Sequence, residues 1–188
     1  QLDDGYFATW LKDLLENHDQ VTIACHGLTH KCWSAYPKDE EGFLAALVEA
    51  DVKLHKFAKD AWRPWFRAPA GYIAPWMAPI IAKAGFELDS SVNPSWIVRK
   101  KAGPWKDWNA VLKALKDSGL VSRPWLCKFG LPTCGPALSI PILRNNARRV
   151  WKKLGPFVLP DETEETVYWH VLDHGRKNGT WKPPLMIE

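Results

Sequence analysis

The sequence lacks the long apolar runs, the repeats and the strong charge bias that would assign it to several classes of protein. No run of about 18 apolar residues occurs, so no transmembrane helix is predicted. The net charge is only +4, and no arginine-rich segment with interleaved aromatic residues stands out, which argues against a nucleic-acid partner. Residues 1–4 have neither the basic start nor the apolar stretch of a secretory signal, and we expect a cytoplasmic protein.

What remains is the composition of an ordinary globular protein. Hydrophobic residues make up 46% and charged residues 24% of the 188 residues, and this length fits one domain with a substantial core. We therefore expect a single domain over residues 1–188. The composition does not indicate an oligomeric state.

The four cysteines form two pairs, each with six residues between its members: Cys25 and Cys32, then Cys127 and Cys134. Structural zinc sites usually place two to four residues between paired cysteines. We therefore favour four reduced thiols that pack as small apolar groups. A four-cysteine zinc site is the alternative.

Tryptophan is unusually frequent, with 12 residues in the chain. Indole rings present flat apolar faces with a polar edge, and such faces stack well on sugar rings. We expect about half of them to fill the core. Others near the motifs described below, among them Trp76 and Trp96, are predicted to contact a carbohydrate.

Hydrophobic periodicity predicts strands that alternate with helices. Helices are expected over residues 6–16, 39–59, 76–84, 106–118 and 140–154, and strands over 21–25, 65–66, 86–88 and 166–170. This alternation is typical of an α/β fold with parallel strands. Polar motif residues repeatedly follow the strands, where barrel-type α/β enzymes place their sites.

The segment Cys25-His26-Gly27-Leu28-Thr29-His30 is the most informative in the chain. Two histidines four residues apart, just past a strand end, can turn both imidazoles toward one point. Neutral imidazole is a good ligand for zinc-type ions. The pattern predicts that His26 and His30 bind one divalent metal ion; two loop histidines with ordinary hydrogen bonds are the alternative.

Three further segments follow in order: Arg67-Ala68-Pro69-Ala70-Gly71-Tyr72, Asp89-Ser90-Ser91 and Tyr168-Trp169-His170. Together with the histidine segment they resemble the motifs of the polysaccharide deacetylase family, the NodB-homology or carbohydrate esterase family four. The resemblance extends from about Asp4 to about Asp173. Each motif is weak alone, but four in the right order are hard to obtain by chance.

The resemblance implies a distorted, incomplete (β/α) barrel and a metal-dependent hydrolase that removes acetyl groups, chiefly N-acetyl groups, from a sugar or polysaccharide. Zinc is the favoured ion, with cobalt, nickel or manganese as alternatives. The family acts on chitin-like oligosaccharides, peptidoglycan and surface polysaccharide intermediates, and we lean toward bacterial surface polysaccharide biosynthesis. The implied partner is therefore a carbohydrate substrate.

The resemblance also implies roles for individual residues. Arg67 would pair with the catalytic carboxylate, a bidentate task that suits guanidinium; a surface ion pair is the alternative. Tyr72 follows the motif glycine, at the position whose backbone N–H would hold the developing oxyanion. Asp89 would orient the general acid His170, or it would cap a turn through the serines that follow it. His170 could instead be a core histidine.

The first motif of the family is an Asp-Asp pair in which one aspartate is the base and the other binds the metal. Asp3-Asp4 offers a match, with Asp3 as the base and Asp4 as the ligand. The spacing is short, however, because residues 6–25 have room for only one helix and one strand before His26. We favour Asp3 or Asp4 as the cap of the first helix, with the first strand or strands of the fold missing from this chain.

Three rival functions stay open at this level. A catalytically incomplete relative would keep the fold and a tryptophan-lined groove but lack the catalytic aspartate. A structural zinc module would use the four cysteines, and a hydrolase on a small amide is compatible with the same fold.

The basic pairs Arg148-Arg149 and Lys152-Lys153 fit a solvated helix face, or the approach to a phosphate-bearing lipid or a membrane surface.

Overall fold

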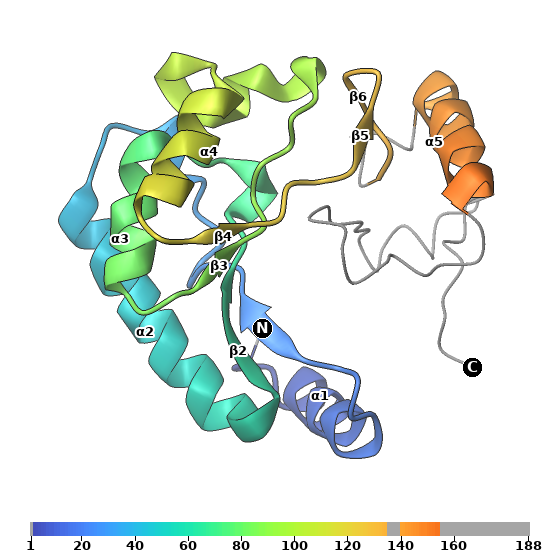
Figure 1. Cartoon of the computed structure of the whole chain (residues 1–188). Helices are drawn as coiled ribbons and strands as arrows, with labels where there is room; N and C mark the ends of the chain where they lie inside the picture. Colours follow the sequence, from blue (N-terminus) through green and yellow to red (C-terminus); the bar gives the residue numbers. More distant parts are fainter. Residues whose placement is uncertain (1, 135–139, 155–188) are drawn as a thin grey trace.

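The computed structural model describes residues 2–134 and 140–154, which form a mixed α/β structure around a parallel sheet (Figure 1). The strands of this sheet are β1 (Ile23–Cys25), β2 (Trp62–Phe66), β3 (Leu88–Asp89) and β4 (Val121–Ser122). All neighbouring strands are parallel, and their order in space is their order in the chain. Among the described helices, none is both long and apolar enough to cross a bilayer.

Helices connect the strands along one side of the sheet. They are α2 (Glu40–Ala58), α3 (Ala78–Lys83) and α4 (Trp108–Asp117), while α1 (Gly5–Asn17) precedes β1. In Figure 1, α2, α3 and α4 follow one another past the same face, as successive crossovers of one hand require. Aspartates start three of these helices, since the side chains of Asp4, Asp39 and Asp107 accept backbone N–H groups in the first turn.

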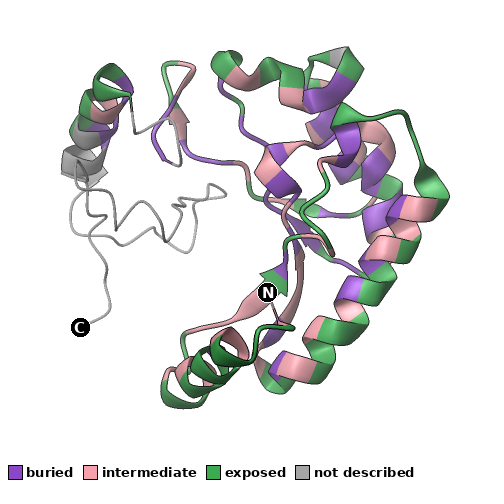
Figure 2. Cartoon of the chain, turned by 180° about the vertical axis from the view of Figure 1, so that it is seen from behind, coloured by how far each residue is buried: buried purple, intermediate pink, exposed green. Residues whose placement is uncertain are grey.

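The core lies between the sheet and these helices, where Figure 2 shows the buried positions. Phe43 on α2 is at its centre, because its ring contacts Trp33, Phe66 and Trp76 at centroid distances of 5.4, 6.1 and 5.7 Å. The helix predicted over residues 39–59 buries Phe43, Leu47 and Ala50 of α2 against this core. Aromatic packing thus fixes α2 against the strands that carry the site.

Proline interrupts the ladder between β1 and β2. Ile23 pairs with Trp62 and Cys25 with Phe66, so the register slips around Pro64. Proline has no N–H to donate, and a bulge is where a strand tolerates it. The Pro64 carbonyl still accepts the N–H of Glu87 at 2.8 Å, which keeps β3 aligned with the end of β2.

The structure also contains elements that the sequence patterns did not predict. A series of 3₁₀ turns, η5 (Trp96–Trp105), precedes α4, and an antiparallel hairpin pairs β5 (Cys127–Lys128) with β6 (Leu131–Pro132). The predicted basic helix is confirmed as α5 (Pro141–Leu154). Shorter 3₁₀ turns are η1 (Trp33–Ala35), η2 (Lys59–Ala61), η3 (Pro69–Gly71) and η4 (Pro75–Met77).

The sequence prediction of a parallel α/β architecture is confirmed. The predicted helices over 6–16, 39–59, 106–118 and 140–154 appear with ends shifted by a few residues, and that over 76–84 is divided into η4 and α3. Strand β4 was not predicted. The expected strand over 166–170, which carries His170, lies outside the described residues.

The interpretation of Asp4 as a helix cap yields a stability prediction. The Asp4 carboxylate accepts the Phe7 N–H at 3.0 Å, so Asp4→Ala should lower the free energy of unfolding by about 1 kcal/mol. Asp4→Asn should be nearly neutral, since asparagine caps equally well. Urea unfolding measures both variants, and an equal loss in the two would show that the carboxylate is needed for something other than the cap.

Candidate functional site

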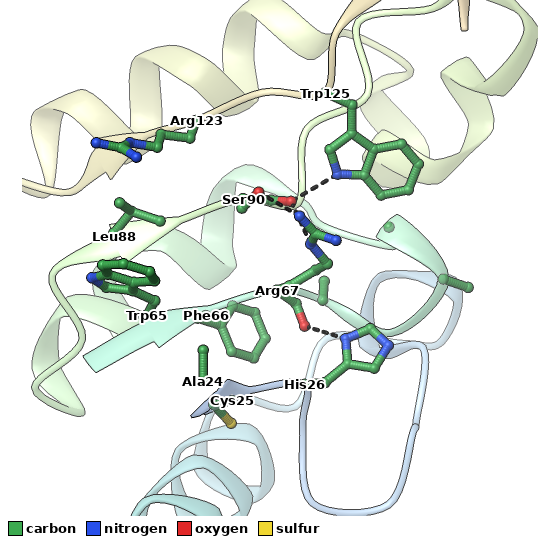
Figure 3. Close-up of a pocket in the computed structure, with 13 residues that line it drawn as sticks. Ala24, Cys25, His26, Trp65, Phe66, Arg67, Leu88, Ser90, Arg123 and Trp125 are labelled. Atoms are coloured by element: carbon green, nitrogen blue, oxygen red, sulfur yellow. Dashed lines mark hydrogen bonds between the residues drawn. The ribbon is translucent and has the colours of Figure 1, made fainter. Parts of the chain in front are cut away.

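Polar side chains follow each of the four parallel strands at the same edge of the sheet. His26 follows β1, Arg67 follows β2, Ser90 follows β3 and Arg123 follows β4. The carboxyl ends of neighbouring parallel strands are where α/β proteins bind their ligands. A cavity of about 490 Å³ lies there, lined among others by these four residues, Trp65 and Trp125 (Figure 3).

His26 is oriented by the backbone of the next strand. Its Nδ1 lies 2.9 Å from the carbonyl oxygen of Arg67. Because a carbonyl only accepts, Nδ1 carries the proton, and the lone pair of the neutral ring is on Nε2. A histidine that donates one ring N–H to a backbone carbonyl and presents the other nitrogen is the arrangement found at metal-ligating histidines.

His30 comes close to His26 through a tight loop. The two ring centroids are 5.1 Å apart, and the ring planes are inclined at 74° (edge to face). The loop needs left-handed backbone at Gly27 (φ 82°) and at His30 (φ 57°). A Cβ on Gly27 would lie 3.1 Å from Pro69 Cγ, so this glycine lets the histidine loop pack on the motif that follows β2.

Arg67 holds the ends of β2 and β3 together. Its Nε–H donates to the Ser90 carbonyl at 3.1 Å, and its Nη2–H donates to Ser90 Oγ at 2.9 Å. The same carbonyl accepts the indole N–H of Trp125 at 2.8 Å, and the guanidinium carbon lies 5.8 Å from the Trp125 ring centroid. The ring also packs on Gly71, where a Cβ would lie 3.2 Å from Trp125 Cη2.

Asp89 and Ser91 form a second link between the same two strand ends. The Ala68 N–H donates to Ser91 Oγ at 2.8 Å, and the Ser91 hydroxyl donates to Asp89 Oδ2 at 2.6 Å. Asp89 Oδ1 accepts the Ser91 N–H at 2.9 Å. The expected turn cap at Asp89 is thus present through Ser91, and it fixes the residue next to Arg67.

Asp89 is fully buried. Burial raises the pKa of its carboxyl from 3.8 to about 6, while the two Ser91 hydrogen bonds and the Arg67 charge lower it. A carboxylate out of contact with solvent cannot take a proton from a water in the cavity. We therefore assign Asp89 to positioning, and its proposed action on His170 stays a prediction.

The residues predicted to bind substrate lie in three different places. The Tyr72 N–H donates to the Pro69 carbonyl at 3.1 Å and closes η3, so in this structure it is a turn donor. Trp76 packs on Phe43 in the core. Trp96 is 56% exposed at the start of η5.

The metal set is not completed within the part of the chain that is described. In the described residues, no three His, Cys, Asp or Glu side chains lie together where they could hold a metal ion. The four cysteines therefore form no zinc site there. Asp4 caps α1, and Asp3 is exposed. Asp3 lies near Lys53, whose pKa is raised chiefly by its hydrogen bond with Glu49 and to a lesser extent by Asp3. The structure brings His26, Arg67 and Asp89 together but not the first aspartate pair.

Trp125 and Arg123 are site residues that the motif reading missed. Both follow β4, a strand of only two residues, which is too short to show an apolar period. A sequence signal for them was present. Before Asp89, a helix is followed by a glycine, a short strand and polar residues, and the same order recurs with Gly119 and the run Ser122-Arg123-Pro124-Trp125.

Comparisons of the chain with protein-family models, with curated proteins and with solved structures each gave no match.

The raised pKa of Asp89 predicts a defined pH dependence. Because its folded pKa of about 6 exceeds its ordinary value of 3.8, the folded state binds the proton more tightly. This group therefore stabilises the fold below pH 4, and that contribution is lost as pH rises to about 6. The difference in unfolding free energy between the parent and Asp89→Asn should decrease over this window in urea titrations. A pH-independent difference would contradict the assignment.

Proposed function

We propose that this protein is a metal-dependent hydrolase of the polysaccharide deacetylase type, which removes N-acetyl groups from a sugar or polysaccharide on an incomplete (β/α) barrel. The observation that carries the proposal is the paired imidazoles after β1, with His26 oriented by the Arg67 carbonyl. The consecutive parallel strand order supports the barrel, since a (β/α) barrel adds its strands in sequence.

The described residues fit a divalent ion in part. His26 and His30 would hold it through nitrogen, and the tautomer set by Arg67 places the His26 lone pair on Nε2. A bound zinc ion polarises a carbonyl and lowers the pKa of water. A third ligand would have to come from outside the groups that the described residues bring together.

The chain's own side chains would bind and orient the sugar. The half-buried Trp65 offers an aromatic surface to the cavity, and the buried Trp125 lines it beside the polar edge made by Arg67 and Ser90. Flat apolar faces next to hydrogen-bonding groups suit a pyranose ring, which has apolar faces and a polar rim. Among the lining residues that are described, none is acidic.

Proton transfer is the part of the proposal that rests on the family resemblance. His170 would protonate the leaving amine, and a carboxylate would take the proton from the attacking water. Arg67 would hold that carboxylate, since it already bridges the two strand ends beside the histidines. Asp89 and Ser91 would fix the Arg67 backbone and act through it on His26.

A carbohydrate-binding relative without catalysis is the second candidate. It is favoured by one observation: within residues 2–134 and 140–154, no carboxylate joins the two histidines in a metal-binding group. The aromatic cavity would remain able to bind a sugar. The two candidates differ in whether acetate is released from a bound N-acetylated sugar.

Metal content and turnover test the proposal. The parent chain should carry about one zinc per chain after incubation with zinc and dialysis, and His26→Ala/His30→Ala should carry none. His55→Ala is the matched control, because His55 is exposed on α2 outside the motifs. The parent should also release acetate from N-acetyl chito-oligosaccharides, with at least a hundredfold loss in the double variant.

Three results would overturn parts of this account. Equal zinc in the parent and the double variant would remove His26 and His30 from the metal site. Zinc and sugar binding without acetate release would favour the binding relative. Loss of zinc in the control His55→Ala would show that the chain binds metal through unspecific surface histidines.

A further inference from the structure

The turn of the β5–β6 hairpin presents a phenylalanine in an unusual backbone conformation. Phe129 and Gly130 separate the two strands, with φ values of 56° and 69°. A two-residue hairpin turn with positive φ at both positions is type I′, which favours asparagine, aspartate or glycine at the first position. A phenylalanine there is strained, and its side chain is 89% exposed. Neither turn preference nor core packing accounts for this residue.

Trp96 lies against this turn. The Trp96 backbone N–H donates to the Gly130 carbonyl at 3.3 Å, and a Cβ on Gly130 would lie 2.6 Å from Trp96 Cδ1. Trp96 is 56% and Ile97 42% exposed. The turn and the start of η5 therefore form one apolar surface that faces solvent.

The first turn of α5 adds two more exposed apolar side chains, Ile140 and Ile142. Helix α5 contacts β6, and its buried side chains Leu143, Ala147 and Val150 hold it in place. In Figure 1 the hairpin turn, η5 and the start of α5 all reach the upper edge of the molecule. We call Trp96, Ile97, Phe129, Ile140 and Ile142 the hairpin surface.

In the described segments that carry the hairpin surface, the charged side chains all have one sign. Residues 90–106 contain no Asp or Glu, and none occurs between Asp117 and Asp161. Arg99 and Lys100 are exposed on η5. Arg149, also exposed, is two helical turns from Ile142 on the same face of α5. Projecting apolar side chains flanked by basic residues are the pattern that binds the interface of an anionic bilayer.

We propose that the hairpin surface docks the protein on an anionic lipid bilayer. Phe129 and Ile142 enter the boundary between headgroups and acyl chains, while Arg99, Lys100 and Arg149 lie at the level of the lipid phosphates. A bilayer fits better than a protein partner, because a single projecting turn and a uniform charge need no shaped cavity opposite them. This binding requires neither metal nor turnover, so it is independent of the proposed hydrolase activity.

Vesicle sedimentation of the full chain tests the proposal. The chain should bind phosphatidylcholine vesicles with about one quarter phosphatidylglycerol, should bind pure phosphatidylcholine far more weakly, and should lose most binding at high salt. Phe129→Asn should weaken binding about tenfold. Arg99→Gln and Lys100→Gln should each weaken it about fivefold.

The Phe129→Asn variant separates docking from folding. Asn-Gly is the preferred sequence for a type I′ turn, so the variant should keep or raise the melting temperature while it loses vesicle binding. Tyr6→Asn is the matched control, because Tyr6 is an aromatic residue 86% exposed on α1, and it should bind as the parent does. No binding to anionic vesicles, or binding that Phe129→Asn leaves unchanged, would overturn the proposal.

Discussion

The site depends on the hydrogen-bonded link between the ends of β2 and β3. Asp89 accepts from Ser91, and Ser91 accepts from the Ala68 N–H. The peptide that this link fixes also carries the Arg67 carbonyl, to which His26 donates. The first metal-ligand candidate is therefore placed by a buried carboxylate three hydrogen bonds away. The low-dielectric interior strengthens each bond in such a chain and makes an unpaired member costly.

The contacts of Arg67 and Trp125 with Ser90 give the site its aromatic wall. The Ser90 carbonyl accepts from both Arg67 and Trp125, so the guanidinium and the indole are held at one point of the β3 loop. Gly71 lets the indole approach closely from the other side. The three strand ends thus present an imidazole, a guanidinium and an indole at one cavity, a combination that suits a polar ligand with an apolar face.

The sequence predicted the elements that are long enough to show a clear hydrophobic period. The helix over α2 was correct because its buried side chains follow helical spacing. The strand before His26 was correct in place, although Cys25 is the one buried residue of β1. Strand β4 was missed because its two residues are too few to show a period, and Phe129-Gly130 was missed as a turn because phenylalanine is not a turn residue. Motif order found Arg67 and Asp89, and the local bonds between Asp89 and Ser91 follow from the sequence. The contacts of Arg67 with Ser90 and of Ala68 with Ser91 depend on the pairing of β2 with β3, which local sequence does not encode. The cap at Asp4 was predicted because residues 6–25 have room for only one helix and one strand, and its hydrogen bond with the Phe7 N–H confirms it.

The protonation of His26 is the most direct test of this account. Long-range ¹H–¹⁵N correlation spectra at neutral pH distinguish the two neutral tautomers of a histidine ring. The account predicts the proton on Nδ1 in the metal-free parent chain, and a loss of that preference in Ser91→Ala, where the Ala68 and Asp89 link is broken. A proton on Nε2 in the parent, or an unchanged tautomer in Ser91→Ala, would contradict the claim that the strand-end link positions this histidine.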